Sequence, residues 1–267
     1  MYQLLAIDLD DTLFDTGDDT PAANEEALRT LDQRGVHVVL CSGRPTPNMV
    51  NIARGLFRTE RTHYVISYNG AIVEEVETGR EVSRRGVDVG VARQIIRYAR
   101  EHGLLAQYYH DDEFFVEYED PRADEYSARS GLPYRVVGPL EDFMDEPSPK
   151  LLLQGPAEKL PDHLAELREM AAGRWNATIS KPVYLEVLNP DVDKGRAMLA
   201  LAASLGIPQA GLVAVGDSIN DMEMIRDAAV GVAVANAREE VKQVADMVTG
   251  RTAAEGAVAE VVERLFG

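Results

Sequence analysis

The sequence predicts an α/β protein with a doubly wound, mainly parallel sheet and an inserted α+β cap domain. Near both ends of the chain, short unbroken apolar runs alternate with helical segments, which is typical of parallel strands covered by helices on both faces. In the middle of the chain, strands pair as hairpins beside helices, which indicates a separate domain. We therefore expect a discontinuous core formed by 1–83 and 190–267, with 84–189 inserted as the cap.

Composition limits the classes of partner that the protein can have. The 267 residues include 45 acids against 27 Lys and Arg, and the formal charge of −18 opposes binding to nucleic acid or to an anionic membrane. No apolar run is long enough to span a bilayer, and the first strand begins at once, without a signal-peptide core. The one cysteine, Cys41, excludes internal disulfides. We expect a soluble, cytoplasmic protein, monomeric or homodimeric, with a small-molecule partner.

The first part of the core is predicted as three strands separated by two helices. The expected elements are a strand at 4–7, a helix at 21–33 capped by Thr20, a strand at 36–41, a helix at 47–57 and a strand at 64–67. Strands that alternate with helices in this way predict a βαβαβ unit and thus a parallel, Rossmann-like sheet.

The middle of the chain changes to paired strands, and the parallel pattern then resumes. A hairpin with strands at 71–76 and 81–83 is expected first, still within the core range. The cap elements are then expected as a helix at 87–102, strands at 104–110 and 113–119, a helix from Pro121, strands at 134–137 and 150–154, a helix at 158–172, and a hairpin at 175–180 and 183–188. The core elements that follow are expected as a helix at 194–205, a strand at 211–215, a helix at 222–228, a strand at 231–234, and helices at 237–245 and from 255.

Six aromatic side chains lie on the predicted cap strands: Tyr108, Tyr109, Phe114, Phe115, Tyr118 and Tyr184. Because side chains alternate between the faces of a strand, about half of them should face the cap's own helices. The others could contact substrate.

Two acids follow the first buried strand. Asp8 and Asp10 lie just past its carboxyl end, where open α/β sheets bind ligands. Carboxylates this close repel one another unless a cation lies between them, and Mg²⁺ is held by carboxylates, waters and phosphate oxygens. The alternative is an acidic loop after a buried strand. At the end of the second strand, Ser42 and Gly43 offer a hydroxyl and open backbone N–H groups to an anion.

Four segments from different strand ends thus carry compatible chemistry: Asp8 with Asp10, Ser42, Lys194, and Asp217 with Asn220 and Asp221. On these motifs the whole chain resembles the haloacid dehalogenase (HAD) superfamily of phosphohydrolases, specifically its Cof-type group, subfamily IIB. The four motifs of that superfamily are matched by 8–13, 42–44, 194–195 and 216–221. Asp11 departs from the pattern, since many members have Gly there. Aspartate tolerates turn conformations, so we expect the chemistry to be intact.

The resemblance implies a role for each acid. Asp8 would attack phosphorus and form an aspartyl-phosphate. Asp10 would protonate the leaving oxygen and then deprotonate water. Mg²⁺ would be held by the carboxylates of Asp8 and Asp217 and the backbone carbonyl of Asp10, and Asp221 would orient the metal shell. The alternative for Asp221 is a plain acid at a helix N-terminus.

The resemblance also implies which groups bind the phosphoryl oxygens. Ser42 and the backbone N–H groups of Leu9 and Gly43 would hold them, and Lys194 would neutralise their charge. Asn220 would donate to the phosphoryl group or to Lys194. Ser42 has the alternative role of a helix cap. Arg44 could equally contact substrate or form a surface ion pair.

The predicted function is a Mg²⁺-dependent phosphomonoester hydrolase for a small organic phosphate, with sugar phosphates the leading class. One alternative is a phosphosugar mutase on the same scaffold. An alternative of another class is a phospho-aspartate signalling receiver, although a receiver has no reason to enclose its site and lacks an acid placed like Asp10. The five histidines show no ligand spacing, so none is expected to bind metal: His37, His63, His102, His110 and His163.

Overall fold

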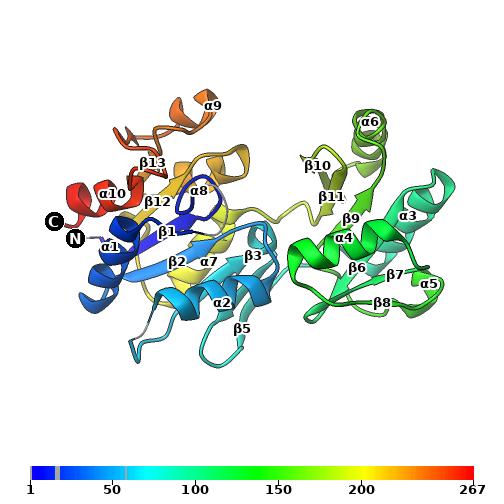
Figure 1. Ribbon diagram of the computed structural model, residues 1–267, viewed down its shortest axis with the longest axis horizontal. Coiled ribbons are helices and arrows are strands. Elements are labelled where there is room, and N and C mark those ends of the chain that lie inside the picture. The colour runs from blue at the N-terminus through cyan, green and yellow to red at the C-terminus, as the bar shows by residue number, and fades with distance from the viewer. Residues whose placement is uncertain (1, 16–18, 58) are drawn as a thin grey trace. The chain divides into compact units, whose positions relative to one another are not determined.

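A computed structural model describes residues 2–15, 19–57 and 59–267, and it divides into two compact units (Figure 1). The core unit is Met1–Ser83 with Asp193–Gly267, and the cap unit is Arg84–Val192. The cap unit continues three residues beyond the expected end at 189. The segment beyond 189 is tied to that unit, because the Asn176 side chain of the cap donates to the carbonyl of Pro190 at 3.3 Å.

The core unit is built on one eight-stranded sheet in the order β14-β13-β12-β1-β2-β3-β4-β5 (Figure 1). Its strands are β1 (Leu4–Asp8), β2 (His37–Cys41), β3 (Tyr64–Ser67), β4 (Ile72–Glu75), β5 (Glu81–Arg84), β12 (Leu212–Gly216), β13 (Val230–Ala233) and β14 (Met247–Val248). β1 is parallel to both β2 and β12, whereas β4 is antiparallel to β3. The chain leaves β1 on one side and returns on the other, so β1 marks the point where such sheets open a ligand crevice.

Helices cover both faces of this sheet. They are α1 (Ala22–Gln33), α2 (Thr46–Leu56), α7 (Lys194–Ser204), α8 (Met222–Asp227), α9 (Glu239–Lys242) and α10 (Ala257–Leu265). Leu5 and Ile7 of β1 pack in the hydrophobic cluster that contains α1, α2 and α10, while Leu4 and Ala6 pack in the cluster that contains α7. All four side chains are fully buried, which explains the unbroken apolar run and confirms the doubly wound fold.

The cap unit is a six-stranded, mostly antiparallel sheet in the order β10-β11-β9-β6-β7-β8. Its strands are β6 (Leu105–His110), β7 (Glu113–Val116), β8 (Tyr134–Val136), β9 (Leu151–Gln154), β10 (Asn176–Lys181) and β11 (Tyr184–Leu188). Its helices are α3 (Val89–Glu101), α4 (Pro121–Ser130), α5 (Leu140–Phe143) and α6 (Leu160–Ala171).

The cap aromatics divide between the two faces of the cap sheet. Tyr108 and Phe115 pack in the cluster that contains α3 and α6. Tyr109, Phe114 and Tyr184 instead surround Tyr126 of α4, with ring centroids 5.2 to 6.2 Å from it. These five side chains are buried, whereas Tyr118 is exposed. The expected alternation is therefore present, but α4 covers part of the second face.

Several element ends differ from the expected ones. α1 begins after Pro21, and its N-terminus has no side-chain cap hydrogen bond. α10 begins only after Gly256, whose φ of +89° interrupts the helical backbone. α9 is a single turn, and α5 and β14 were not predicted because segments of two to four residues are too short to show a period. Among the described residues, no helix has the length and hydropathy needed to cross a membrane.

Candidate active site

The centre of the candidate site is the ammonium group of Lys194, at the first residue of α7. Its Nζ lies 2.5 Å from Oδ1 of Asp8 and 2.7 Å from Oδ1 of Asp221, and the side chain is fully buried. A cation is unfavourable at a helix N-terminus, so the two carboxylates provide the compensating charge. Burial alone would lower the pKa of Lys194, but Asp221 and Asp8 raise it above its ordinary value. The lysine is therefore expected to be protonated at neutral pH, beside Asp8.

Asp221 is the buried anchor of this arrangement. Its Oδ2 accepts hydrogen bonds from the backbone N–H groups of Asp217 and Ser218, at 3.1 and 3.0 Å, while Oδ1 binds Lys194. The loop can turn this tightly because residue 216 is glycine: a Cβ there would lie 2.5 Å from Cβ of Asp221. Asp221 therefore acts as more than a helix N-terminal acid, since it fixes both the loop and the lysine.

The acids at this sheet edge have the geometry of a ligand set for a hard cation. Asp8, Asp217 and Asp221 each place one carboxylate oxygen within 4.8 Å of the others. Burial, followed by the charge of Asp221, raises the pKa of Asp8 well above its ordinary value and raises the pKa of Asp217 to about 6. One lysine cannot neutralise three carboxylates, and oxygen donors suit Mg²⁺. The residues present therefore fit the expected metal, with Asp8 and Asp217 as the available ligands.

The loop after β1 turns sharply beyond Asp8. The carbonyl of Leu9 accepts the N–H groups of Leu13 and Phe14, both at 2.9 Å, and Asp11 adopts a φ of +61°. Glycine occupies such left-handed positions most easily, which explains its frequency here in the family, and aspartate is among the residues that tolerate them. The departure at Asp11 thus leaves the turn intact.

Asp10 and Arg44 form an ion pair on the more exposed side of the site. Nε of Arg44 lies 3.1 Å from Oδ2 of Asp10, and Nη2 lies 2.5 Å from Oδ1. The Asp10 side chain is 56% exposed. Of the two roles expected for Arg44, the structure contains an ion pair, but its partner is the acid to which the resemblance assigns proton transfer.

The segment after β2 lies beside the segment after β3. Ser42 is buried, and its Oγ accepts the N–H of Arg44 at 3.2 Å within the turn before α2; it is not the cap of that helix, whose N-cap is Pro45. A Cβ on Gly43 would lie 3.1 Å from the side-chain amide of Asn69. Asn220, expected to contact the phosphoryl group or Lys194, donates instead to Oδ1 of Asn69 at 3.0 Å. Asn69 was not named as a site residue, although its place at the end of β3 was a usable signal.

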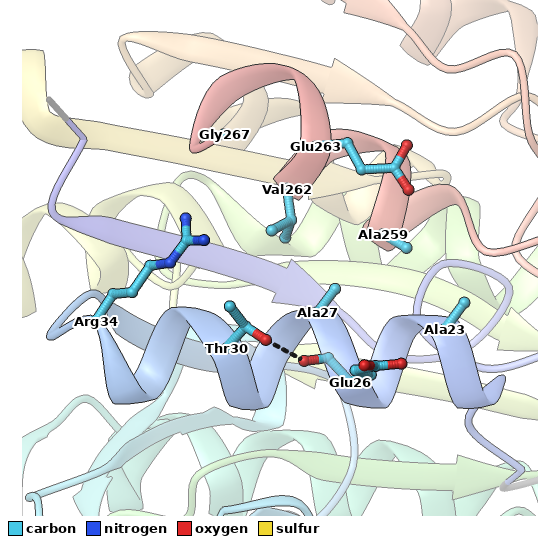
Figure 2. Close-up of a pocket in the computed structure, with 9 residues that line it drawn as sticks. All are labelled: Ala23, Glu26, Ala27, Thr30, Arg34, Ala259, Val262, Glu263 and Gly267. Carbon is cyan, nitrogen blue, oxygen red and sulfur yellow. Dashed lines mark hydrogen bonds between the residues drawn. The ribbon is translucent and has the colours of Figure 1, made fainter.

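A groove of about 500 Å³ lies elsewhere on the core unit, between α1 and α10 (Figure 2). Its lining includes small side chains and charged ones: Ala23, Ala27, Ala259, Glu26, Arg34 and Glu263. None of the candidate site residues lines it. We therefore assign the chemistry to the ends of β1, β2 and β12 rather than to this groove.

Comparison with known proteins identifies the family. Residues 5–262 match the model of the haloacid dehalogenase-like hydrolases. Phosphatase YwpJ of Bacillus subtilis is 29% identical over 99% of this chain and 100% of its own length. The 5-amino-6-(5-phospho-D-ribitylamino)uracil phosphatase YitU of the same organism is 26% identical over 98% of this chain and 97% of its own. A haloacid dehalogenase-like hydrolase from Bacteroides thetaiotaomicron has a crystal structure that superposes with a TM-score of 0.90, at 31% identity and full coverage of both chains.

The chain therefore belongs to the haloacid dehalogenase-like hydrolases, and it is a phosphatase of their Cof-type group. The predicted resemblance, the fold class and the enzyme class are confirmed. Hydrolases of this superfamily generally use Mg²⁺. Because the match spans both units, the alternative of a signalling receiver is set aside.

Proposed function

We propose that this phosphatase hydrolyses a small organic phosphomonoester, with sugar phosphates as the leading class, through an aspartyl-phosphate on Asp8. The observation that carries the proposal is the contact of Lys194 Nζ with both Asp8 and Asp221 at the carboxyl end of the central strand. A carboxylate held beside a fixed cation is pre-positioned to attack an anionic phosphoryl group, because the cation offsets the repulsion between them. The name of the relative YitU describes a phosphorylated ribityl compound, which supports the substrate class.

In the first step, a carboxylate oxygen of Asp8 forms a bond to phosphorus while the bond between phosphorus and the leaving oxygen breaks. Asp10 donates the proton that the leaving oxygen needs. Lys194, the Ser42 hydroxyl and the backbone N–H groups of Leu9 and Gly43 stabilise the charge on the phosphoryl oxygens. Asn220 would act on this set indirectly, because it donates to Asn69, whose side chain lies beside Gly43.

In the second step, water attacks the phosphorus of the aspartyl-phosphate. Asp10 accepts the proton of this water, and the bond from phosphorus to Asp8 breaks to release inorganic phosphate. Asp8, Asp217 and the backbone carbonyl of Asp10 would hold Mg²⁺, with Asp221 fixing the loop behind them. When bound, the ion would neutralise charge on the phosphoryl group.

The direct test is release of inorganic phosphate from a panel of phosphorylated metabolites, with Mg²⁺ present, by the wild-type chain and by Asp8→Asn. We expect turnover of at least one sugar phosphate by the wild type and none by the variant. The same assay separates the mutase alternative, because a mutase would interconvert phosphosugar isomers without releasing phosphate. If none of the esters in the panel releases phosphate, the proposed substrate class is wrong.

Two further expectations belong to this proposal. The cap unit, 84–192, would select the substrate, because it is inserted between the second and third motifs. The protein would act in the cytoplasm, since the single buried cysteine, Cys41, suits a reducing compartment. We expect the protein to be a monomer or a homodimer.

A further inference from the structure

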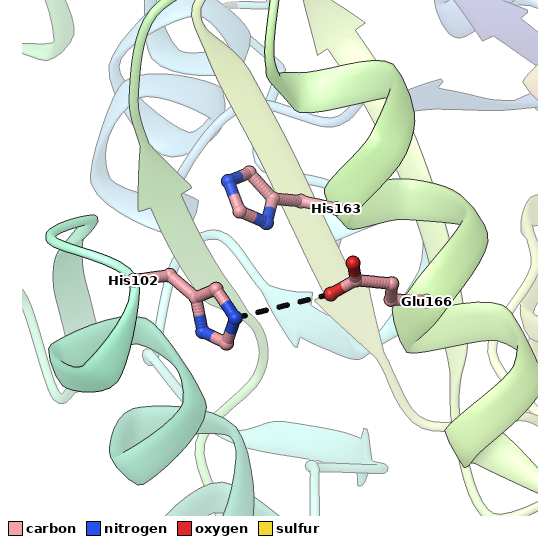
Figure 3. A group of neighbouring side chains, drawn as sticks. All are labelled: His102, His163 and Glu166. Carbon is pink, nitrogen blue, oxygen red and sulfur yellow. Dashed lines mark ion pairs between the residues drawn. The ribbon is translucent and has the colours of Figure 1, made fainter.

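The cap unit contains a cluster of potential metal ligands far along the chain from the acidic motifs. His102 follows the C-terminus of α3, and His163 and Glu166 lie one turn apart on α6 (Figure 3). Each of the three offers one ligand atom, and these atoms all lie within 4.8 Å of one another. The spacing along the sequence gave no reason to pair the histidines, because the two helices come together only in the folded cap unit, on one face of its sheet.

The hydrogen bonding of His102 fixes which of its nitrogens is available. Its Nδ1 lies 2.8 Å from the backbone carbonyl of Tyr98. Since a carbonyl can only accept, Nδ1 carries the proton, and in the neutral ring Nε2 keeps its lone pair. Histidines that bind metals typically donate their other ring nitrogen to a carbonyl or carboxylate in this way. The imidazole is therefore oriented as a ligand before any metal binds.

The free nitrogen of His102 faces an acid. Its Nε2 lies 4.0 Å from Oε2 of Glu166, and Figure 3 shows the imidazole and the carboxylate pointing toward one another. This distance is too long for a hydrogen bond. Ligand atoms around a tetrahedral Zn²⁺, at about 2.0–2.2 Å from the ion, are roughly 3.4 Å apart. Small side-chain rotations that move the ligand atoms by about an ångström would bring them to that spacing, and the side chains of His102 and Glu166 are partly exposed.

The hydroxyl of Tyr98 connects the remaining members. It lies 2.8 Å from Nδ1 of His163 and 2.5 Å from Oε2 of Glu166, and the Tyr98 ring stacks on His102 at 4.1 Å between centroids. The tyrosine thus holds the His163 ring and the Glu166 carboxylate on the side of the cluster that faces His102. Two imidazoles and one carboxylate are the ligands of three-residue zinc sites, which keep a fourth position for water.

We propose that His102, His163 and Glu166 bind a divalent transition metal ion of the Zn²⁺ class, which joins α3 to α6 and stabilises the cap unit. The nitrogen ligands distinguish this site from the all-oxygen set at Asp8 and Asp217, so the two sites select different ions. Mg²⁺ would occupy the core site and bind poorly to the imidazoles.

The test uses Co²⁺, because tetrahedral Co²⁺ with nitrogen ligands absorbs visible light far more strongly than Co²⁺ in an octahedral oxygen site. The full chain is freed of metal, saturated with Mg²⁺, and titrated with Co²⁺. We expect one equivalent of an intense visible band, abolished by competition with Zn²⁺. His102→Ala and His163→Ala should each weaken Co²⁺ binding at least about tenfold, whereas His110→Ala, on β6 of the same unit, should not change it.

Two results would overturn the proposal. One is the absence of a saturable band at millimolar Co²⁺, which would mean that the three side chains form hydrogen bonds but do not bind a metal ion. The other is a band that survives both variants. Where the variants do not fold, Zn²⁺ protection of wild-type histidines from diethyl pyrocarbonate, mapped by mass spectrometry, decides the question. Protection of His102 and His163 but not of His110 is expected, and equal modification of all three with and without Zn²⁺ would contradict the site.

Discussion

The guanidinium of Arg44 contacts both carboxylate oxygens of Asp10, through Nε at 3.1 Å and Nη2 at 2.5 Å. The two residues come from the loops after β1 and β2, which are neighbouring parallel strands, so the pair depends on the register of the sheet. An arginine that holds both oxygens controls where the acid points. It therefore positions the group to which we assign proton transfer.

Loss of this contact should affect difficult leaving groups most. In Arg44→Gln, Asp10 is no longer held, so we expect kcat on a sugar phosphate to fall by up to about fivefold, the value of a partly exposed ion pair. p-Nitrophenyl phosphate should be almost unaffected, because nitrophenolate departs without a proton. Arg80→Gln, which removes an exposed arginine paired with Glu75, is the control. An equal rise in KM for both esters would instead identify Arg44 as a contact of the substrate phosphate.

The sequence was sufficient for the elements that carry strong periodic patterns. β1 and β3 were predicted to within one residue, because strands buried on both faces give unbroken apolar runs and glycine or polar residues end them. Three of the four motifs also fall at the ends of the neighbouring parallel strands β1, β2 and β12, whereas the third begins α7.

Contacts between distant loops could not be predicted in the same way. The hydrogen bond from Asn220 to Asn69 joins positions 151 residues apart, and no local pattern encodes it. The pairing of Asp10 with Arg44 and the meeting of His102 with His163 likewise require the packing of separate elements. Side-chain direction in the cap was open for the same reason, since the position of α4 decides which aromatics are covered.

The stabilising effect of Mg²⁺ should depend on pH. Burial and Asp221 raise the pKa of Asp217 from its ordinary value of 3.8 to about 6. Between these two pH values and without metal, the folded chain therefore holds a proton on Asp217 that the unfolded chain has already released. The contribution of Asp217 to the free energy of unfolding is therefore full below the pKa that Asp217 has in the unfolded chain, and it is lost as pH rises through about 6. A bound cation favours the carboxylate and removes that loss. We expect Mg²⁺ to raise Tm more at about pH 7.5 than at about pH 5.

Thermal unfolding at both pH values, with Mg²⁺ or with EDTA, measures this difference. The pKa of Asp8 is raised in the same direction, so the two acids reinforce the effect. Asp217→Asn removes one titrating ligand and should reduce both the Mg²⁺ shift and its pH dependence. A Mg²⁺ shift of the same size at both pH values would show that no acid with a raised pKa binds the ion.

Two helical glycines should respond in opposite ways to alanine. A Cβ on Gly195 would lie 2.7 Å from the backbone carbon of Glu223, so α7 and α8 must separate, whereas a Cβ on Gly55 in α2 meets nothing within 4 Å. We expect Gly195→Ala to cost roughly 1–3 kcal/mol of unfolding free energy and Gly55→Ala to add up to about 1 kcal/mol. Urea unfolding measures both. Because Lys194 precedes Gly195, only Gly195→Ala should also lower turnover, and equal stability of the two variants would contradict the close packing.

Substitution should distinguish the nucleophile Asp8 from the proton donor and acceptor Asp10, although both acids lie close together in the sequence. Asp8→Asn should abolish the covalent step for every ester, because an amide is a poor nucleophile. Asp10→Asn keeps the nucleophile and the backbone carbonyl but loses the proton donor. Its first step should therefore slow by about 10²–10⁴-fold on a sugar phosphate and far less on p-nitrophenyl phosphate.

The second step gives Asp10→Asn a distinct signature. Breakdown of the aspartyl-phosphate needs Asp10 as a base, so on the activated ester this variant should accumulate phosphorylated Asp8. Single-turnover kinetics with both esters, and intact mass for the phosphoryl adduct, provide the measurement. Asp11→Asn, next in the chain and also an acid, is the control, because asparagine tolerates the φ of +61° at that position. Equal losses on the two esters without an adduct would show that Asp10 is not the acid and base, and that the proton comes from another group.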